Sequence, residues 1–215
     1  MHARRRLPAF AAINLSTEGR SEPRRSRPGW SIDPRIDEQH QPDDTIFSEL
    51  LERGHMAARD HVIWGATEDV RREADRHSFT LSNVCPQLAR FNSAGGEWWR
   101  IERCIAEALA TSEDRCSIFM GPVFRADDQD YDDLRSARSG AAWGTGIRIP
   151  TRFWMVVAWR ADDGVKYRAF FLDQGDELRA AGPLEFDFET PLGVHEVSLA
   201  RIERATDLAF DWADD

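Results

Sequence analysis

The sequence contains no apolar run long enough to cross a membrane, which takes about 20 residues. A short apolar stretch, Pro8 to Leu15, follows a basic start, as it would in a signal peptide. This stretch ends in a polar segment without a clear small-residue cleavage site, so we expect Arg6 to Asn14 to form an early strand instead. The compartment stays open, because the pattern is compatible with a cytoplasmic protein and with export by another route.

Cysteine is scarce as well. Only Cys85, Cys104 and Cys116 occur, and none of them has CxxC-type spacing. An odd number excludes a complete disulfide framework, and the spacing does not fit a zinc site. Buried free thiols are therefore expected, although one pair could be oxidised in an exported protein.

Positive charge is in deficit, with a formal net charge of -10. The first 60 residues carry equal numbers of basic and acidic side chains, so the deficit lies in the rest of the chain. Binding of phosphate depends on local potential rather than on net charge. Local positive charge could come from Arg53, Arg59, Arg71, Arg72 and Arg76. For the last three, the charge spacing over Glu68 to Arg76 favours a solvated, salt-bridged helix.

Internal repeats and coiled-coil heptads are absent, and the length of 215 residues fits one domain over residues 1–215 with a sizeable core. Residues 18–44 are rich in proline, arginine, serine and aspartate and are predicted to form a long irregular loop. The acidic run from Asp127 to Asp133 lacks the glycine and the terminal glutamate of a calcium loop, which favours a solvated loop.

The elements predicted from periodicity give an α+β fold, a mostly antiparallel mixed sheet with packed helices. A helix is expected over Glu97 to Thr111, because apolar residues recur at helical intervals and define a buried face. A hairpin is expected around Ala161 to Gly164. Shorter predictions are a helical turn at Phe47 to Leu51, strands at Ser78 to Leu81, Cys116 to Met120 and Val194 to Val197, and a final helix from Leu199 to about Ala205.

Chemically versatile side chains concentrate between Leu51 and Glu102, a segment that reads as strand, strand and helix. It contains Glu52-Arg53-Gly54-His55, then Asn83-Val84-Cys85-Pro86-Gln87, then Asn92, then Trp98-x-x-x-Glu102. A neutral His55 can take a proton from water. Arg53 offers a fork of donors that fits two phosphate oxygens, and Asn92 offers an oxygen ligand for a hard cation such as Mg2+.

These residues resemble the core of the DNA/RNA non-specific endonucleases, which are members of the His-Me finger (ββα-metal) superfamily. The resemblance implies a ββα-metal active-site motif and a Mg2+-dependent endonuclease, possible also with Mn2+, that hydrolyses phosphodiester bonds in DNA and RNA. By this resemblance His55 is the general base and Asn92 is the direct protein ligand of a single metal. Glu102 organises metal-bound water, and Arg53, Asn83 and Gln87 shape the site and hold the phosphate. A homodimer and an inhibitor protein are further partners that the resemblance allows.

Several departures from the family pattern leave a second interpretation open. Glu52 stands where many relatives have Asp, two residues around Gly95-Gly96 lengthen the loop after Asn92, and Ala106 replaces a phosphate-binding Arg of some relatives. Relatives also carry one more strand before Arg6, so the chain could begin late. The alternative is a catalytically inactive nuclease fold that binds nucleic acid or a protein partner.

Some residues allow two readings. Trp98 and Trp99 could stack on bases, but helical spacing favours Trp98 as a core residue. Asn83 could brace the site rather than contact substrate, and Gln87 has the same status. His61 is a second choice for the base, because it has no matching position in the family motif.

Overall fold

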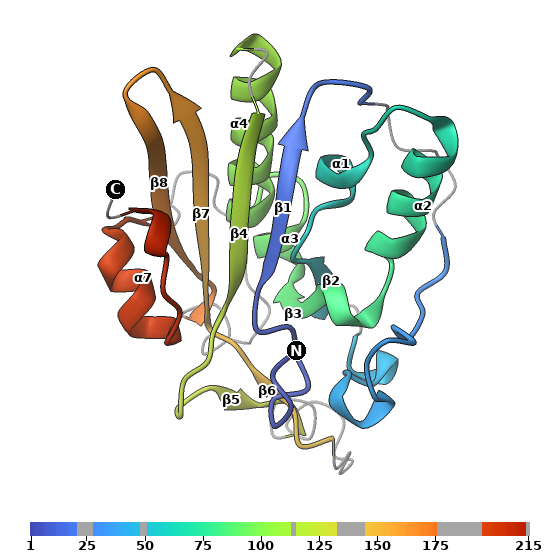
Figure 1. The fold of residues 1–215 in the computed structure, drawn as a ribbon. Coiled ribbons are helices and arrows are strands. Elements are labelled where there is room, and N and C mark those ends of the chain that lie inside the picture. The colour runs from blue at the N-terminus through green and yellow to red at the C-terminus, as the bar shows by residue number, and fades with distance from the viewer. Residues whose placement is uncertain (21–27, 48–50, 113–114, 133–144, 176–194, 214–215) are drawn as a thin grey trace.

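A five-stranded antiparallel sheet forms the centre of the computed structural model, which describes residues 1–20, 28–47, 51–112, 115–132, 145–175 and 195–213 (Figure 1). The strand order is β1-β4-β7-β8-β9, and each neighbouring pair is antiparallel. Its strands are β1 (Ala11–Ser16), β4 (Arg115–Val123), β7 (Arg152–Ala161), β8 (Gly164–Asp173) and β9 (His195–Glu196).

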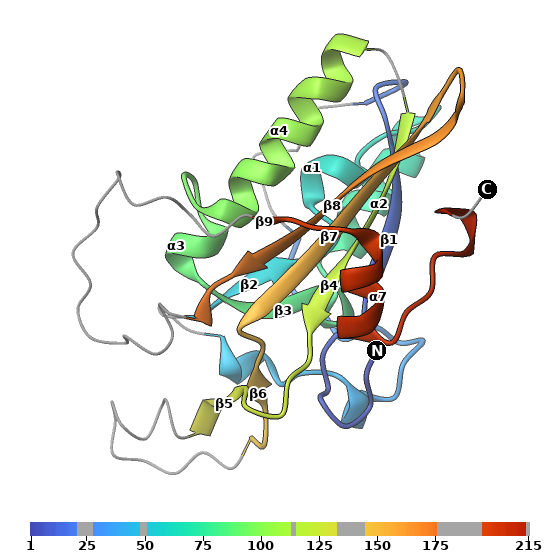
Figure 2. The ribbon, with the colours of Figure 1, turned by 90° about the vertical axis from the view of Figure 1, so that its left-hand side faces the viewer.

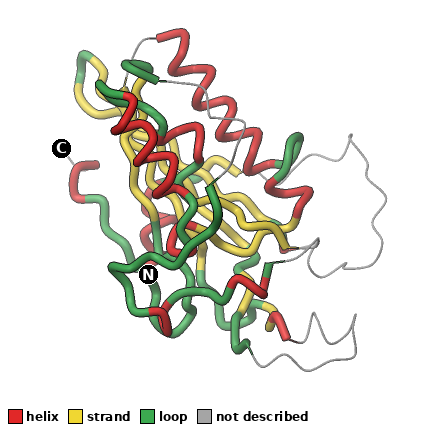
Figure 3. Tube along the Cα trace, turned by 90° about the vertical axis from the view of Figure 1, so that its right-hand side faces the viewer, coloured by secondary structure: helices red, strands yellow, loops and turns green. Residues whose placement is uncertain are grey.

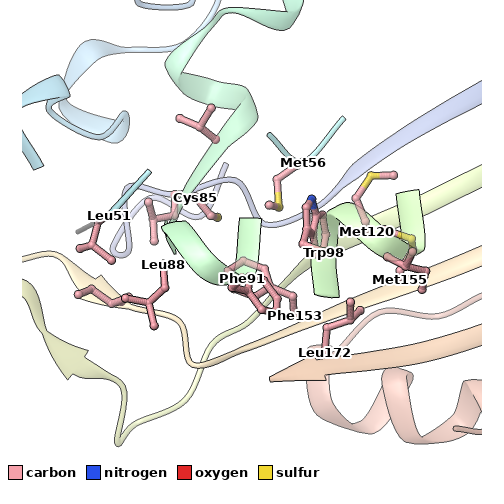
Figure 4. Close-up of a cluster of buried hydrophobic side chains, with 14 of the residues drawn as sticks. Leu51, Met56, Cys85, Leu88, Phe91, Trp98, Met120, Phe153, Met155 and Leu172 are labelled. Carbon is pink, nitrogen blue, oxygen red and sulfur yellow. The ribbon is translucent and has the colours of Figure 1, made fainter. Parts of the chain in front are cut away.

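The central strand β7 is apolar along most of its length because both faces of the sheet are covered. Phe153, Met155 and Val157 face one buried cluster, and Trp154 and Val156 face the other. Figure 2 shows α4 (Glu97–Ser112) on one side of the sheet and α7 (Leu199–Thr206) on the opposite side. The larger cluster lies on the side of α4 (Figure 4).

A second, two-stranded hairpin carries most of the motif found in the sequence. Strand β2 (Leu51–His55) pairs antiparallel with β3 (Val84–Leu88). The fully buried Gln174 joins this hairpin to the central sheet: its Oε1 accepts from the Leu88 backbone N–H, and its Nε2 donates to the carbonyl oxygens of Pro86 and Pro150. These bonds fix the hairpin to the edge of β8.

The remaining elements connect these units. Figure 3 shows the molecule from the side of α1 and α2, with helices in front of the strands. The helices are α1 (Arg59–Val62), α2 (Glu68–Ser78) and α3 (Ala89–Asn92). The short strands β5 (Gln129–Asp130) and β6 (Arg148–Ile149) pair with each other. The 3-10 helices are η1 (Glu38–His40), η2 (Asp44–Ile46), η3 (Leu81–Asn83) and η4 (Asp211–Ala213).

The strongest periodic signals are confirmed. Helix α4 spans the expected residues and buries Trp98, Ile101 and Leu109, although Ala108 on the expected apolar face is exposed. The β7–β8 hairpin turns at Asp162–Asp163, and α2 and α7 agree with the predicted helices. Strand β9 lies within the predicted Val194 to Val197, of which residue 194 is outside the described part of the chain.

Several predicted boundaries are wrong for local reasons. Residues 3–6 form a turn closed by a bridge between His2 and Leu7, and residues 8–10 are irregular, so β1 starts only at Ala11. Residues Ser78 to Leu81 end α2 and enter η3, and the second strand of the hairpin begins at Val84.

Two other boundaries also shift. Strand β4 continues through Gly121-Pro122 to Val123. Leu51, the end of the predicted helical turn, belongs to β2, and residues 48–50 of that turn lie outside the described part of the chain.

Predictions for the acidic run and the cysteines are partly confirmed. Asp127 is exposed, but Asp128 is buried, pairs with Arg5 and accepts the Arg125 backbone N–H. All three cysteines are free, with Cys104 exposed and the other two buried. No helix in the described ranges combines the length and the apolar character that a bilayer span needs.

Candidate active site

One cavity of about 1120 Å³ brings together four of the six residues that the motif suggests. His55 and Arg53 reach it from β2, Asn92 from the end of α3, and Glu102 from α4. Asn83 and Gln87 lie outside its lining. The other lining residues are Arg20, Pro28, Trp30, Glu52, Ala58, Arg59, Asp60, His61, Phe79, Ser93, Ala94, Trp99, Arg103, Ala106 and Glu107.

The glycine between Arg53 and His55 is required by packing within the hairpin. A Cβ atom on Gly54 would lie 1.9 Å from Oε1 of Gln87, which is fully buried on the paired strand. The absence of a side chain lets Gln87 lie against the backbone of β2. Alternation along β2 then places Arg53 and His55 on the same side of the strand.

His55 is held between two aromatic rings. The centroid of its imidazole lies 5.0 Å from that of Trp30 and 5.3 Å from that of Phe79, the latter edge to face. Trp30 belongs to the irregular segment before β2 and is itself partly buried against the core. These contacts limit the rotation of the imidazole while one side of His55 faces the cavity.

Arg53 is fixed by charge and by aromatic contacts. Its Nε donates to Oδ1 of Asp44 at 2.7 Å. Its guanidinium carbon lies 5.1 Å from the ring centroid of Phe47 and 5.7 Å from that of Trp30, distances typical of cation–π contact. The two terminal nitrogens make no hydrogen bond within the described residues, so they can still donate toward the cavity.

Asn92 is oriented by Glu52. Nδ2 of Asn92 donates to Oε2 of Glu52 at 2.8 Å, and the Ser93 hydroxyl donates to both oxygens of the same carboxylate at 2.9 Å. An ionised carboxylate only accepts, so the amide nitrogen must face Glu52 and the amide oxygen must face the other way. Within the described residues Oδ1 of Asn92 accepts no hydrogen bond.

The loop after Asn92 is shaped by its two glycines. Gly95 has a φ of 95°, which L side chains rarely adopt. A Cβ atom on Gly96 would lie 2.3 Å from the carbonyl oxygen of Arg90. The Gly95-Gly96 pair therefore lets the chain turn tightly from α3 into α4, which brings Asn92 and Glu102 to the same cavity.

Glu102 lines the cavity, but protein atoms surround most of its carboxyl group. This desolvation raises the pKa of Glu102 to about 8, an effect that the Trp98 indole partly offsets and that the charge of Asp60 reinforces. The charged form of Glu102 is thus costly in the protein alone, and a nearby cation would stabilise it.

Asn83 braces the turn after His55. Its Oδ1 accepts from the Ala57 backbone N–H, and its Nδ2 donates to the carbonyl oxygens of Ala57 and Ser78. This geometry favours the bracing role over phosphate contact.

Gln87 also has a packing role, against Gly54. Neither atom of its buried amide has a partner in the described structure.

His61 joins α1 to α4. Its Nε2 lies 3.2 Å from the Glu102 carbonyl oxygen, and the ring is almost completely buried. Burial lowers the pKa of His61 to about 4, so it is neutral at pH 7.

The arginines of α2 do not contribute to the cavity. Arg71 and Arg72 pair with Glu68, and Arg76 lies near Glu73 and His77 on the exposed side of that helix. This is the salt-bridged helix that the charge spacing favoured. Arg59 does line the cavity, but its guanidinium donates twice to the Asp75 carboxylate.

The oxygen atoms of Asn92 and Glu102 are suitable donors for a divalent cation. No group of three or more histidine, cysteine or acidic side chains capable of holding a metal occurs in the described part of the chain. The amide oxygen of Asn92, which Glu52 turns away from itself, is an oxygen donor of the type that Mg2+ accepts while it keeps several waters. The Glu102 carboxylate faces the same cavity and can bind those waters.

Trp30 and Asp44 were not predicted from the sequence, and no role was predicted for Glu52. The first two lie in the irregular segment before β2, where no periodicity or motif identifies them. Glu52 could have been found, because a carboxylate next to the Arg-Gly-His element is a natural partner for a nearby amide.

The hairpin, the helix and the polar cavity between them define an α+β protein whose site contains a histidine, an arginine, an amide and a carboxylate. The chain belongs to the DNA/RNA non-specific endonuclease family, because the model of this family matches residues 1–213.

Similar proteins agree with this family. The chain is 28% identical over 162 residues to the uncharacterized protein y4fB of Sinorhizobium fredii (strain NBRC 101917 / NGR234). That match covers 72% of this chain and 22% of the relative, so this chain corresponds to about a fifth of it. The structure resembles a chain in the crystal structure of the EndoG/EndoGI complex, with a TM-score of 0.68 and 20% identity, over 96% of this chain and 79% of that chain. At this identity the likeness shows the fold alone.

Proposed function

We propose that this protein is a Mg2+-dependent endonuclease that hydrolyses phosphodiester bonds in DNA and RNA with little sequence preference. The observation that carries the proposal is the meeting of His55, Arg53, Asn92 and Glu102 at one cavity, in a chain of this family. Mn2+ is a second candidate cation. A homodimer and an inhibitor protein stay predictions from the resemblance.

His55 is the general base in this proposal. Its ring is held by Trp30 and Phe79 and faces the cavity, so it can accept the proton of a water molecule that attacks phosphorus. General bases of this kind typically accelerate a reaction by about 10² to 10⁴-fold.

Asn92 and Glu102 are the proposed cation-binding residues, the first through Oδ1 and the second through water. A divalent cation bound there supplies positive charge beside the phosphate and the leaving oxygen. Glu52 keeps the Asn92 amide in the orientation that binding needs. Arg53, anchored through Nε by Asp44, directs its terminal nitrogens to phosphate oxygens.

The test is cleavage of supercoiled plasmid and single-stranded RNA by the purified protein with Mg2+ or with EDTA. We expect degradation only with the metal, and a loss of at least about 100-fold in the His55→Ala variant. His77→Ala is the matched control, because His77 is exposed on α2 outside the cavity and should leave the rate unchanged.

Normal cleavage by a folded His55→Ala protein would contradict the assignment of the base. Intact substrates with several divalent metals, together with a shifted nucleic-acid band, would favour the inactive binding module instead.

A further inference from the structure

Helix α4 presents a distinct face to the cavity. Trp99, Glu102, Arg103 and Ala106 all line it, at positions i, i+3, i+4 and i+7, which fall on one side of a helix. This face adjoins His55 and Asn92 in the same cavity. The opposite side of the helix, with Trp98, points into the core.

The two neighbouring tryptophans therefore differ in their surroundings. Trp98 is fully buried, with its ring centroid 6.2 Å from that of Phe91 and 5.5 Å from that of Phe153. Trp99 is only partly buried and has no aromatic neighbour among the described residues. The Arg103 guanidinium lies over the Trp99 ring, with its central carbon 5.4 Å from the ring centroid. Core packing thus explains Trp98 but not Trp99.

Charge in the cavity is largely compensated. Three of the four arginines that line it are in ion pairs, Arg53 with Asp44, Arg59 with Asp75 and Arg103 with Glu107, and Arg20 is the fourth. The acidic residues Glu52, Asp60 and Glu102 also line the cavity. Attraction of the phosphate backbone, which dominates the affinity of most nucleic-acid-binding proteins, is limited here. Another source of binding free energy is needed, and aromatic stacking is one that does not depend on positive charge.

We propose that Trp99, extended by Arg103 and with open space beside it at Ala106, is a stacking subsite for an unpaired nucleobase next to the scissile phosphate. The proposal rests on the proposed function and makes single-stranded nucleic acid its preferred substrate, with duplex cleaved less efficiently. Bases in a duplex are already stacked and must be extruded before they can reach such a surface, whereas unpaired bases reach it directly. Arg103 contributes because a guanidinium plane also stacks on bases.

The first test compares kcat/KM on a single-stranded oligonucleotide and on the duplex of the same sequence. Trp99→Ala is expected to lower kcat/KM on the single strand by about ten- to a hundredfold and to change the duplex value by less than about threefold. Trp99→Phe should restore most of the single-strand activity. Arg100→Ala, an exposed neighbour on α4 outside the cavity lining, is the matched control and should behave as wild type.

The second test uses abasic substrates. A single base is removed at each position near the cleavage point in turn. At one of these positions the removal should slow cleavage by the wild type. The same abasic strand and the intact strand should be cleaved at equal rates by Trp99→Ala. Equal losses on single strand and duplex, or independent effects of the abasic site and the substitution, would overturn the proposal.

A binding measurement tests the stacking subsite separately from the proposed catalytic role of His55. The affinity of the His55→Ala protein in EDTA is measured for the intact single strand, the abasic strand and the duplex, with and without Trp99→Ala. Stacking predicts tighter binding of the intact strand and loss of that preference in the double variant, whether or not the protein cleaves. No preference for the intact strand would reject the subsite even if wild-type cleavage is normal.

Discussion

At the scale of single residues, the contact between Glu52 and Asn92 determines which atom of the amide faces the cavity. The carboxylate accepts hydrogen bonds from Asn92 and from Ser93, which suits it to position Asn92 as the proposed metal ligand. Groups that orient a metal ligand in this way typically change metal affinity by about 10 to 100-fold when they are altered.

We therefore expect Glu52→Gln to raise the Mg2+ concentration for half-maximal cleavage by about tenfold or more, because a glutamine amide no longer requires Asn92 to present its nitrogen. Activity at saturating Mg2+ should fall much less. Asp162→Asn, in the exposed β7–β8 turn, is the control. A lower maximal rate with an unchanged Mg2+ requirement would place Glu52 in another role.

His61 makes stability depend on pH in a definite direction. Burial lowers its pKa in the folded protein to about 4, from an ordinary value of about 6.5. Between these values the unfolded chain binds the proton and the folded protein does not, so the free energy of unfolding falls as pH falls from 6.5 through 4. The full effect corresponds to about 3 kcal/mol.

Urea denaturation at pH 7.5 and at pH 4.5 measures this effect. We expect His61→Gln to reduce the difference in unfolding free energy between the two pH values by about 2 kcal/mol or more. His77→Gln, which changes an exposed histidine, should leave the difference unchanged. An identical pH dependence in wild type and His61→Gln would show that other groups cause the acid sensitivity.

The meeting of His55, Arg53, Asn92 and Glu102 at one cavity was predictable from the sequence, because a motif fixes their spacing, while their roles stay predictions. Trp30, whose ring contacts His55, was not predictable, because it reaches the site from a segment with no periodic pattern. Its position depends on tertiary packing alone.

At the scale of elements, the β2–β3 hairpin depends on close contact between Gly54 and Gln87. We expect Gly54→Ala to destabilise the protein by about 1 to 3 kcal/mol, because the added methyl group overlaps a buried side chain. Gly29→Ala is the matched control, since a Cβ atom there has no neighbour within 4 Å. Thermal unfolding of both variants measures the difference.

A double-mutant cycle identifies the cause of this effect. In a Gln87→Ala background the overlapping side chain is absent, so Gly54→Ala should cost clearly less than it does in the wild type. Equal costs in both backgrounds would indicate backbone strain instead of overlap.

Helix α4, in which the helical spacing of apolar residues continues over several turns, was predictable from the sequence, as was the β7–β8 hairpin. Strand β3 was placed too early, because Pro86 within it lacks a backbone donor and argues against a strand. Proline is tolerated there because, in the described part of the chain, β2 is the one strand that pairs with β3, and Gln174 satisfies the Pro86 carbonyl oxygen.

At the scale of the whole molecule, the net charge of -10 and the ion pairs of three of the four cavity arginines should make binding only weakly dependent on salt. We expect log K for a single-stranded oligonucleotide to fall with log[salt] with a slope of about -2 or shallower, measured by fluorescence anisotropy in EDTA. Ala106→Arg should steepen the slope by about 0.7, the effect of one more neutralised phosphate. A wild-type slope near about -5 would show that many more cations contact the backbone.

Among the residues that the structure describes, those that line the cavity all lie between Arg20 and Glu107, although the central sheet takes most of its strands from the second half of the chain. The described residues of the second half of the chain thus pack beneath the site, and none of them lines the cavity. Substitutions there should alter how much folded protein a cell retains and how long it persists, whereas substitutions in the first half can change the reaction itself. We therefore expect related sequences to tolerate change at the described positions after residue 107 more readily than at the cavity-lining positions before it.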